Sequence, residues 1–463
     1  MPFDAASYII GKNAGGGSSV QVDALDVTAN GTYTAESGHA YNLVTVNVSG
    51  GGSASDNDVR FLDYDGSVVY SYSASDFAAL TAMPDNPTHE GLTSQGWNWS
   101  LADAKSYVAD YGMLDIGQMY ITDDGKTRLY IRIATTGRMD VPVYFSQTVA
   151  NGVTINWGDG SADETFAGTG NITSAHHVYA NIGNYVITLD PAEGCTLGLG
   201  TGQSNTCVMG SYSDMKVYAN MLQSVYGGAA IHLAGNAFQN CSSLTSITIP
   251  NTATSIASSL FSGCRSLTSI TIPNTVTSIA GNAFQNCSSL TSITIPNTAT
   301  SIASSLFSGC SLLARITIPN TVTSIGSSVF QSCFSLTKII FPNSITKIFS
   351  NVCDGCILLT SITLPNTVTS IASSAFQSCF SLTRMTFPNT VTSIASKVFA
   401  SSYSMAEYYM LPETPPTIQS DSLYVPADCK IYVPYSADHS ILNAYKTATN
   451  WSNYASYMEE MPE

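Results

Sequence analysis

Seven cysteines stand at one fixed interval in this chain. They are Cys241, Cys264, Cys287, Cys310, Cys333, Cys356 and Cys379, each 23 residues from the last. Thiols in such a series can ligate metal ions, form disulfides or fill a core. Stacked strands lie about 4.8 Å apart and identical positions point the same way, whereas disulfide Cβ atoms sit about 3.8 Å apart in a specific torsion. The interval therefore predicts a column of buried free thiols.

One pair departs from this pattern, because Cys353 precedes Cys356 in a C-x-x-C arrangement. Cys353 occupies the column that phenylalanine holds in the other units. A structural zinc site needs four ligands, and no second cysteine pair or neighbouring histidine supplies them. We therefore expect a core substitution and no metal. Cys195 and Cys207 lie outside the register, and the sequence leaves open whether they pair.

Two outward-facing columns of the repeats are candidates for binding. Counted every 23 residues from Ser246, one column holds serine, arginine, lysine and finally Glu407, and the column two residues further on is mostly threonine. Threonine suits exposed strand positions and repeats copy themselves, so a purely structural surface is one interpretation. The other is a flat hydroxyl face with a basic patch, suited to an anionic glycan or an acidic protein surface. The candidate ligand-binding residues are Ser292, Thr294, Arg315, Thr317, Lys338, Thr363, Arg384 and Thr386.

Motifs for catalysis are not evident. The sequence has no nucleophile elbow, no Gly-rich phosphate loop before a helix and no H-E-x-x-H, so we expect no enzyme and no cofactor. Asp159 and Asp163 lie in the turn NWGDGSADETF at 156–166, where aspartate normally caps the turn through backbone bonds. Calcium binding there is left open.

The elements that must position the columns follow from the repeat itself. A unit resembling x-F-x-x-C-x-S-L-T-x-I-T-I-P-N-T-x-T-S-I-A-x-x recurs about eight times between 231 and 410. In its LTSITIP stretch, Leu244, Ile247 and Ile249 face inward from a short strand, and Pro250 ends the strand because it cannot donate to a ladder. No coil buries its apolar side alone, so the coils must stack. The period predicts a parallel β solenoid.

The units resemble BspA-like leucine-rich repeats, whose consensus contains F-x-x-C-x-S-L-T-x-I-x-I-P, over nearly 200 residues. That resemblance implies a surface adhesin. The tail, with TPPTI at 414–418, IYVP at 431–434 and then NAYKTATNWSNYASYM, resembles the C-terminal cap of that family. It predicts a closing helix from about 436 to 458 that shields the last coil.

The first half resembles a string of smaller modules. Residues 59–97 are similar to the Listeria–Bacteroides (internalin B-type) repeat in the D-G turn, the P-x-x-P-T-x-E-G stretch and the G-W end. NWGDGSADETF at 156–166 and HHVYANIGNYVITL at 176–189 resemble the two signatures of a polycystic-kidney-disease (PKD) β-sandwich. The start FDAASYIIGKNAGGG and residues 26–52 resemble segments of prophage tail and baseplate proteins of gut Firmicutes.

The sequence thus predicts a mainly β, multidomain chain: small β modules and a PKD-like β-sandwich, then a leucine-rich-repeat solenoid with a C-terminal helical cap. The expected divisions are an N-terminal docking segment with a Gly linker at 1–19, a small β module at 20–52, a β-grasp, internalin B-repeat-like module with a helix at 57–113, a PKD-like sandwich at 114–191, the solenoid at 192–412 and the cap at 413–463.

Composition narrows the class of partner. Charged residues make up only 10% of the 463, against about a quarter in typical globular proteins. The formal net charge of −16 argues against nucleic acid. The block from His232 to Met405 is nevertheless about +5, while its flanks together carry about −21. No stretch of 18 apolar residues predicts a membrane span, and the opening MPFDAASYIIGKNAGGGSS lacks the basic n-region of a secretory signal.

Three functions fit these features. The first is a phage virion protein of the tail, baseplate or fibre, assembled in the host cytoplasm, which docks on other virion subunits through residues 1–19 and recognises a bacterial surface glycan or protein. Free thiols suit assembly in a reducing cytosol. The alternative is a bacterial cell-surface adhesin, and the third is a decoration or scaffold protein. A homo-oligomer is left open.

Overall fold

The computed structural model describes residues 31–33, 44–46, 59–202, 206–211, 218–228 and 231–462, which fall in two units divided after Asp56. In the smaller unit, β1 (Gly31–Tyr33) pairs antiparallel with β2 (Val44–Val46). The predicted docking segment at 1–19, and most of the predicted module at 20–52, lie outside the described residues.

The larger unit begins with a four-stranded sheet in the order β4-β3-β6-β5, accompanied by two helices. Its elements are β3 (Val59–Leu62), β4 (Val68–Tyr72), α1 (Ala74–Ala79), β5 (Leu92–Trp97), α2 (Leu101–Tyr111) and β6 (Leu114–Thr122). Ser73 and Ser100 cap the two helices by accepting hydrogen bonds from backbone N–H groups of the first turn. A core of its own forms around Phe61, Phe77 and Trp97. We call residues 59–122 the N-terminal module.

The module ends later than the sequence suggested. Strand β6 lies between β3 and β5, parallel to β3 and antiparallel to β5. The division expected at residue 114 therefore falls just before a central strand of the sheet. The sequence does not show the true boundary, because a helix that ends in glycine is also typical of a domain end. Here Gly112, the left-handed C-cap of α2, turns the chain back into the same sheet.

Next comes a β-sandwich. One sheet has the order β10-β9-β12-β7-β16-β18 and the other β11-β8-β13-β17. The sandwich elements are β7 (Thr127–Ile133), η1 (Thr136–Arg138), β8 (Asp140–Gln147), β9 (Val153–Asn156), β10 (Glu164–Thr165), β11 (Gly170–Val178), β12 (Gly183–Pro191), β13 (Leu197–Leu199), β14 (Thr206–Cys207), β15 (Gly210–Ser211), η2 (Ala219–Met221), β16 (Leu222–Tyr226) and β17 (Ile231–Leu233).

The two signatures that suggested a PKD-like sandwich meet in its core. The hydroxyl of Tyr179 donates to the carbonyl oxygen of Trp157 at 2.8 Å, and His177 stacks on Trp157 with ring centroids 5.0 Å apart. Hydrogen bonds from Ser161 and His177 lower the pKa of Asp159 to about 2. The signature residues thus position one another, while kinship with PKD domains stays a prediction.

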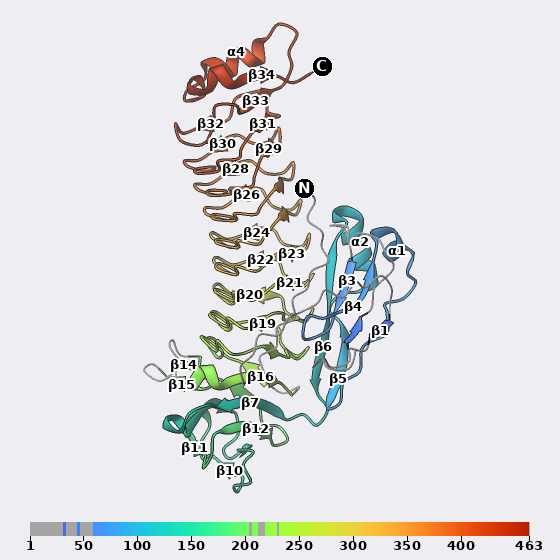
Figure 1. Cartoon of the computed structure of the whole chain (residues 1–463), viewed down its shortest axis with the longest axis vertical. Coiled ribbons are helices and arrows are strands. Elements are labelled where there is room, and N and C mark those ends of the chain that lie inside the picture. The colour runs from blue at the N-terminus through green and yellow to red at the C-terminus, as the bar shows by residue number, and fades with distance from the viewer. Residues whose placement is uncertain are drawn as a thin grey trace. The chain divides into compact units, whose positions relative to one another are not determined.

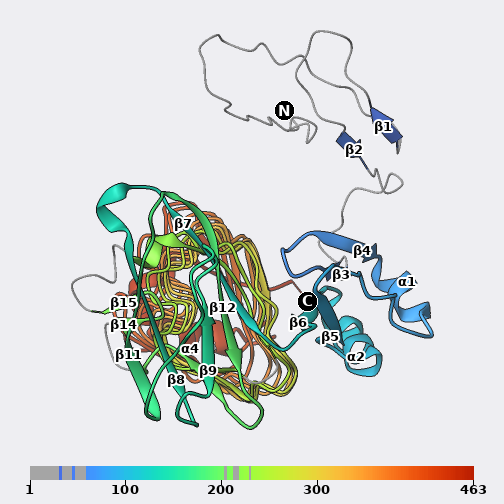
Figure 2. The same cartoon turned by 90° about the horizontal axis from the view of Figure 1, so that it is seen from below.

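Sandwich and solenoid share one hydrophobic core. Strand β16 pairs antiparallel with β7 of the sandwich and parallel with β18 of the first coils. On the other sheet, β13 pairs with β8 and with β17 in the same way. Viewed along the stack in Figure 2, the sandwich strands lie across the end of the superposed coils. The sandwich therefore covers the apolar end that the first coil of a solenoid otherwise exposes.

The solenoid has about ten turns between residues 224 and 460, which confirms the predicted fold class (Figure 1). One row of parallel strands comprises β18 (Ser246–Ile247), β21 (Ser292–Thr294), β23 (Arg315–Thr317), β25 (Lys338–Ile340), β27 (Ser361–Thr363), β29 (Arg384–Phe387), β31 (Glu407–Met410) and β33 (Lys430–Val433). The second row comprises β19 (Ser255–Ile256), β20 (Ser278–Ile279), β22 (Ser301–Ile302), β24 (Ser324–Ile325), β26 (Lys347–Ile348), β28 (Ser370–Ile371), β30 (Ser393–Ile394) and β32 (Thr417–Ile418). We call the outward surface of the first row the strand face.

All eleven cysteines are free and buried, which confirms the prediction for the 23-residue column. Within this column, the six thiols from Cys264 to Cys379 each donate to a backbone carbonyl of the preceding coil, as Cys310 does to Phe284 at 3.1 Å. Ser402 takes over in the next coil, where its hydroxyl donates to Phe376 at 3.1 Å. The column therefore joins neighbouring coils by side-chain hydrogen bonds as well as by packing.

The closing helix is shorter than predicted. Helix α4 spans Ser440–Thr447, η3 (Trp451–Tyr457) follows, and β34 (Met458–Glu460) pairs with β33. The helix ends at Ala448, whose backbone is extended, and Asn450 then turns the chain with a left-handed backbone at φ of 66°. This turn lets the buried Trp451 donate from its ring nitrogen to Pro416 at 2.7 Å. A continuous helix from 436 to 458 would carry that anchor away from the last coils.

Candidate ligand-binding face of the solenoid

The predicted candidate residues do lie in register on one row of strands. Ser292 aligns with Arg315 and Thr294 with Thr317 between β21 and β23. Further along, Lys338 aligns with Ser361 on β25 and β27, and Arg384 with Glu407 on β29 and β31. Because parallel strands keep side chains of equal phase on one side, these residues share the strand face.

Part of that face is covered by the N-terminal module. Ser292, Thr294 and Thr317 are only 7%, 6% and 3% exposed. Strand β6 contacts β21, and the hydroxyl of Thr294 donates to the backbone carbonyl of Asp115. The predicted continuous face is therefore too long, because while the module is docked these three side chains are buried beneath it.

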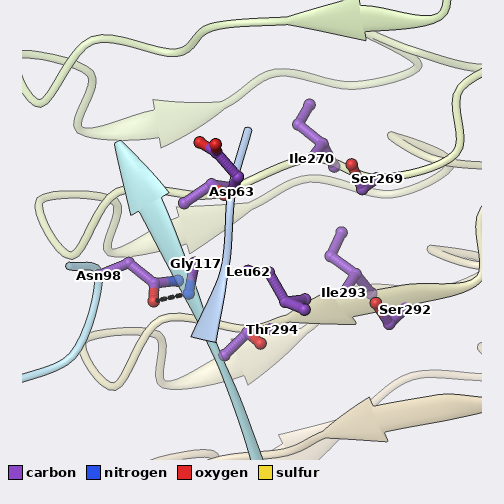
Figure 3. A pocket seen from close by; sticks show the side chains of 10 residues that line it. Leu62, Asp63, Asn98, Gly117, Ser269, Ile270, Ser292, Ile293 and Thr294 are labelled. Carbon is purple, nitrogen blue, oxygen red and sulfur yellow. Dashed lines mark hydrogen bonds between the residues drawn. The ribbon is translucent and has the colours of Figure 1, made fainter. Parts of the chain in front are cut away.

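Close backbone approach makes this cover tight. A Cβ atom placed on Gly117 would lie 2.5 Å from Oγ1 of Thr271, and one on Gly66 would lie 2.7 Å from Oγ of Ser269. Asn98, which is fully buried, accepts from the backbone N–H of Gly117 at 2.8 Å and donates to Ile272 at 3.4 Å. Figure 3 shows Asn98, Gly117 and Ser269 among the residues around a cavity of about 10 Å³, which holds at most one water molecule.

Electrostatics at the cover explain the role of Arg315. Arg60 forms two hydrogen bonds with the carboxylate of Asp115, at 2.8 and 2.6 Å, and Nη2 of Arg315 lies 3.7 Å from the same carboxylate. Asp115 is almost wholly buried, so it requires positive partners there. Arg315 therefore balances the charge of Asp115 in the docked module, and it does not belong to the exposed basic patch that the sequence predicted.

Beyond the module the strand face is open. Thr363, Arg384 and Thr386 are exposed and Lys338 is partly exposed. Among the described residues no ion pair involves Lys338. We call the outward surface of β25, β27 and β29 the open window.

The C-terminal border of the open window is internally paired. Arg384 forms an ion pair with Glu407 at 2.6 Å and lies 5.2 Å above the ring of Tyr409, which stacks on Tyr432 with centroids 4.9 Å apart. Lys430 pairs with Glu459. These contacts occupy charges and ring faces that a ligand would otherwise use, so Arg384 contributes less free positive charge than predicted.

Sequence reasoning missed both borders of the window. Lys430 and Tyr432 continue the two columns at the same 23-residue step beyond Glu407 and Tyr409, so the spacing alone would have found them. The cover by residues 59–122 carries no such signal, since Asp115 and Thr294 are 179 residues apart and neither belongs to a motif.

Within the ranges that the structure describes, no group of three or more His, Cys, Asp or Glu side chains is placed to hold a metal ion. Across the same residues, no helix has both the length and the apolar character needed to cross a bilayer.

Comparisons with known proteins identify the type of repeat in the solenoid. Residues 232–358 and 346–441 match the BspA type leucine rich repeat region, in six copies. Among solved structures, a leucine rich repeat protein of T. pallidum is 28% identical, with a TM-score of 0.34, over 38% of this chain and 83% of that one. A leucine rich cell surface protein of Faecalibacterium prausnitzii is 21% identical, with a TM-score of 0.27, over 56% and 87%. No curated protein matches the sequence. The solenoid is built of BspA-type leucine-rich repeats.

Proposed function

We propose that this protein is a non-enzymatic adhesin of the bacterial surface, which binds a surface glycan or protein through the open window. The observation that carries the proposal is the division of the strand face. Its first coils are occupied by the chain's own module, its last coils are paired with one another, and the stretch between them presents Lys338, Thr363 and Thr386 to solvent.

The chemistry of the window suits a ligand with hydroxyl and anionic groups. Thr363 and Thr386 offer hydroxyls that both donate and accept, and Lys338 offers a positive charge. The neighbouring Ile340 is partly exposed and adds an apolar contact. Regular stacking holds these groups on rigid strands, so little conformational entropy is lost when a ligand binds.

Cell-surface placement is favoured over a virion. The BspA-type repeats, which cover 232–441, support an adhesin. The virion hypothesis rests on the free thiols and on resemblances within residues 1–52, most of which lie outside the described residues. Because the thiols are all buried, they are protected from oxidation at a cell surface as well and do not favour the virion. Fractionation decides between the two, since an adhesin is recovered with the bacterial envelope and a virion protein with purified particles.

The binding proposal is tested with a variant in which Lys338→Ser, Thr363→Ala and Thr386→Ala are combined. Fluorescently labelled chain is mixed with intact bacterial cells and with purified cell-wall glycans, and bound fluorescence is measured. We expect the triple variant to lose adsorption because its substitutions remove the window's polar contacts. The matched control is Lys347→Ser, which removes an exposed lysine from the second row of strands. Equal adsorption of the triple variant and the native chain would refute the proposal.

A further inference from the structure

A second surface of the solenoid is exposed and apolar. The turn that follows the cysteine column presents a large apolar side chain in five consecutive coils. These are Leu312, Phe334, Leu358, Phe380 and Tyr403, with exposed fractions between 42% and 61%. Phe380 stacks on Tyr403 with ring centroids 5.7 Å apart, and the backbone N–H of Leu358 donates to the carbonyl of Phe334 in the coil before it. We call these five residues the apolar edge.

Folding does not require these side chains to be apolar. In the preceding coils the same two turn positions hold Ser242 and Ser243, then Arg265 and Ser266, then Ser288 and Ser289. The turns nevertheless keep the same hydrogen bond between coils, as Ser266 N–H to Ser242 and Ser335 N–H to Ser311 show. The apolar edge begins about where the cover by the N-terminal module ends, and the hydrogen bond of the turn forms with or without an apolar side chain there.

The size of the apolar edge is that of an interaction site. Side chains of this type, about half exposed, present roughly 80–100 Å² each, or about 450 Å² for the five. Contiguous patches of roughly 300–600 Å² on a monomer are often functional. A standard protein interface buries about 800 Å² on each partner, so the uncharged rows beside the edge must supply the remainder.

Spacing and charge point to the identity of the partner. The side chains of the apolar edge repeat once per coil. The distance between coils is 5.4–5.9 Å, measured between the centroids of stacked phenylalanine rings in the core. An extended peptide places side chains on the same side about every 6.6 Å, so its side chains no longer match those of the edge after a few coils. A second copy of this solenoid has the same period by construction. The positions directly before the cysteine and directly before the strand are Gly, Ser, Thr or Ala in these coils, so the two rows that border the edge carry no charge.

We propose that the apolar edge is the interface of an antiparallel homodimer. A two-fold axis through Leu358 places Phe334 against Phe380 of the second copy and Leu312 against its Tyr403. Residues 59–231 carry 17 acidic and 7 basic side chains. An antiparallel pair puts these acidic ends far apart, whereas a parallel pair puts them side by side.

Sedimentation equilibrium of the full chain tests the proposal. We expect concentration-dependent association to twice the 48.9 kDa of one chain. Combining Phe334→Ser, Leu358→Ser and Phe380→Ser restores the serine of the earlier coils, and it raises the dissociation constant at least about tenfold by removing the central apolar contacts. Phe349→Ser is the matched control, because Phe349 is 38% exposed at a different position of the coil. Circular dichroism verifies that each variant is folded.

Orientation is tested by disulfide capture. The native cysteines are all buried, so an introduced surface cysteine is the reactive one. Under mild oxidation Leu358→Cys links two copies, because the residue faces itself across the two-fold axis, and Leu312→Cys does not. A native chain that stays monomeric at about 100 µM, well above the dissociation constant of a typical specific complex, overturns the proposal. Linkage through Leu312→Cys overturns the antiparallel arrangement.

Discussion

Replacing Gly117 with valine tests whether the N-terminal module really covers the first part of the strand face. The added Cβ atom would lie 2.5 Å from Oγ1 and 2.9 Å from Cγ2 of Thr271, so the threonine side chain or one of the two backbones must move. Overpacking of this kind costs typically about 1–3 kcal/mol. The cost falls on the docked state, because the three atoms nearest to the added Cβ all belong to Thr271 of the solenoid.

The assay measures how fast a covered position becomes reactive. Ser292→Cys places a nearly isosteric thiol under the module, and the eleven native thiols are buried. If labelling proceeds through undocking, a loss of about 1–3 kcal/mol accelerates it by about 5-fold to 160-fold. Ser361→Cys, three coils further on in the same column and exposed, labels fast whether residue 117 is glycine or valine.

A second glycine supplies the control for the substitution. Gly137 has no atom within 4 Å of the position its Cβ would take, so Gly137→Val leaves the labelling of Ser292→Cys slow. Rapid labelling of Ser292→Cys with Gly117 intact, or an unchanged rate after Gly117→Val, would refute the docked arrangement.

Two predictions concern the thiol column. Cys310→Ala removes the hydrogen bond to Phe284 and leaves a cavity, which lowers the free energy of unfolding by about 1.5–2.5 kcal/mol in urea titrations. Cys310→Ser lowers it less, because a serine hydroxyl can make the same hydrogen bond, as Ser402 does in its own coil. Equal losses for the two variants would contradict the hydrogen-bonding role of the thiol. Burial raises the pKa of Cys310 to about 12 from an ordinary 9.0, so between those values the folded chain keeps a proton that the unfolded chain loses, and stability falls as pH rises through this window. Urea midpoints measured from pH 8 to 11 should therefore fall more steeply for the native chain than for Cys310→Ser, and parallel slopes would count against this cause.

The solenoid could be predicted because one short unit specifies it many times over. Inward Leu244, Ile247 and Ile249, the strand-ending Pro250 and the cysteine column recur at a constant step, so local chemistry and global architecture agree. The same redundancy predicted which residues share the strand face. It also made the burial of the cysteines predictable, since bridging is incompatible with stacking.

The candidate site was only partly predictable, because its limits depend on contacts that no repeat encodes. The hydroxyl of Thr294 is buried by Asp115, and the space for that contact depends on Gly117 and Gly66 lacking side chains. Nothing in the local sequence marks these glycines as docking residues. The end of helix α4 and the left-handed turn at Asn450 are likewise determined by where Trp451 anchors, which is a tertiary contact.

In the proposed function, ligand contacts the open window and leaves the covered coils untouched. Adsorption to intact bacterial cells of two variants from the same column, Ser361→Trp in the window and Arg315→Ser at the covered border, tests this most directly. We predict that Ser361→Trp abolishes adsorption, because the indole blocks the exposed strand surface, and that Arg315→Ser leaves adsorption unchanged. Retained adsorption by Ser361→Trp together with loss of adsorption by Arg315→Ser would contradict binding at the open window.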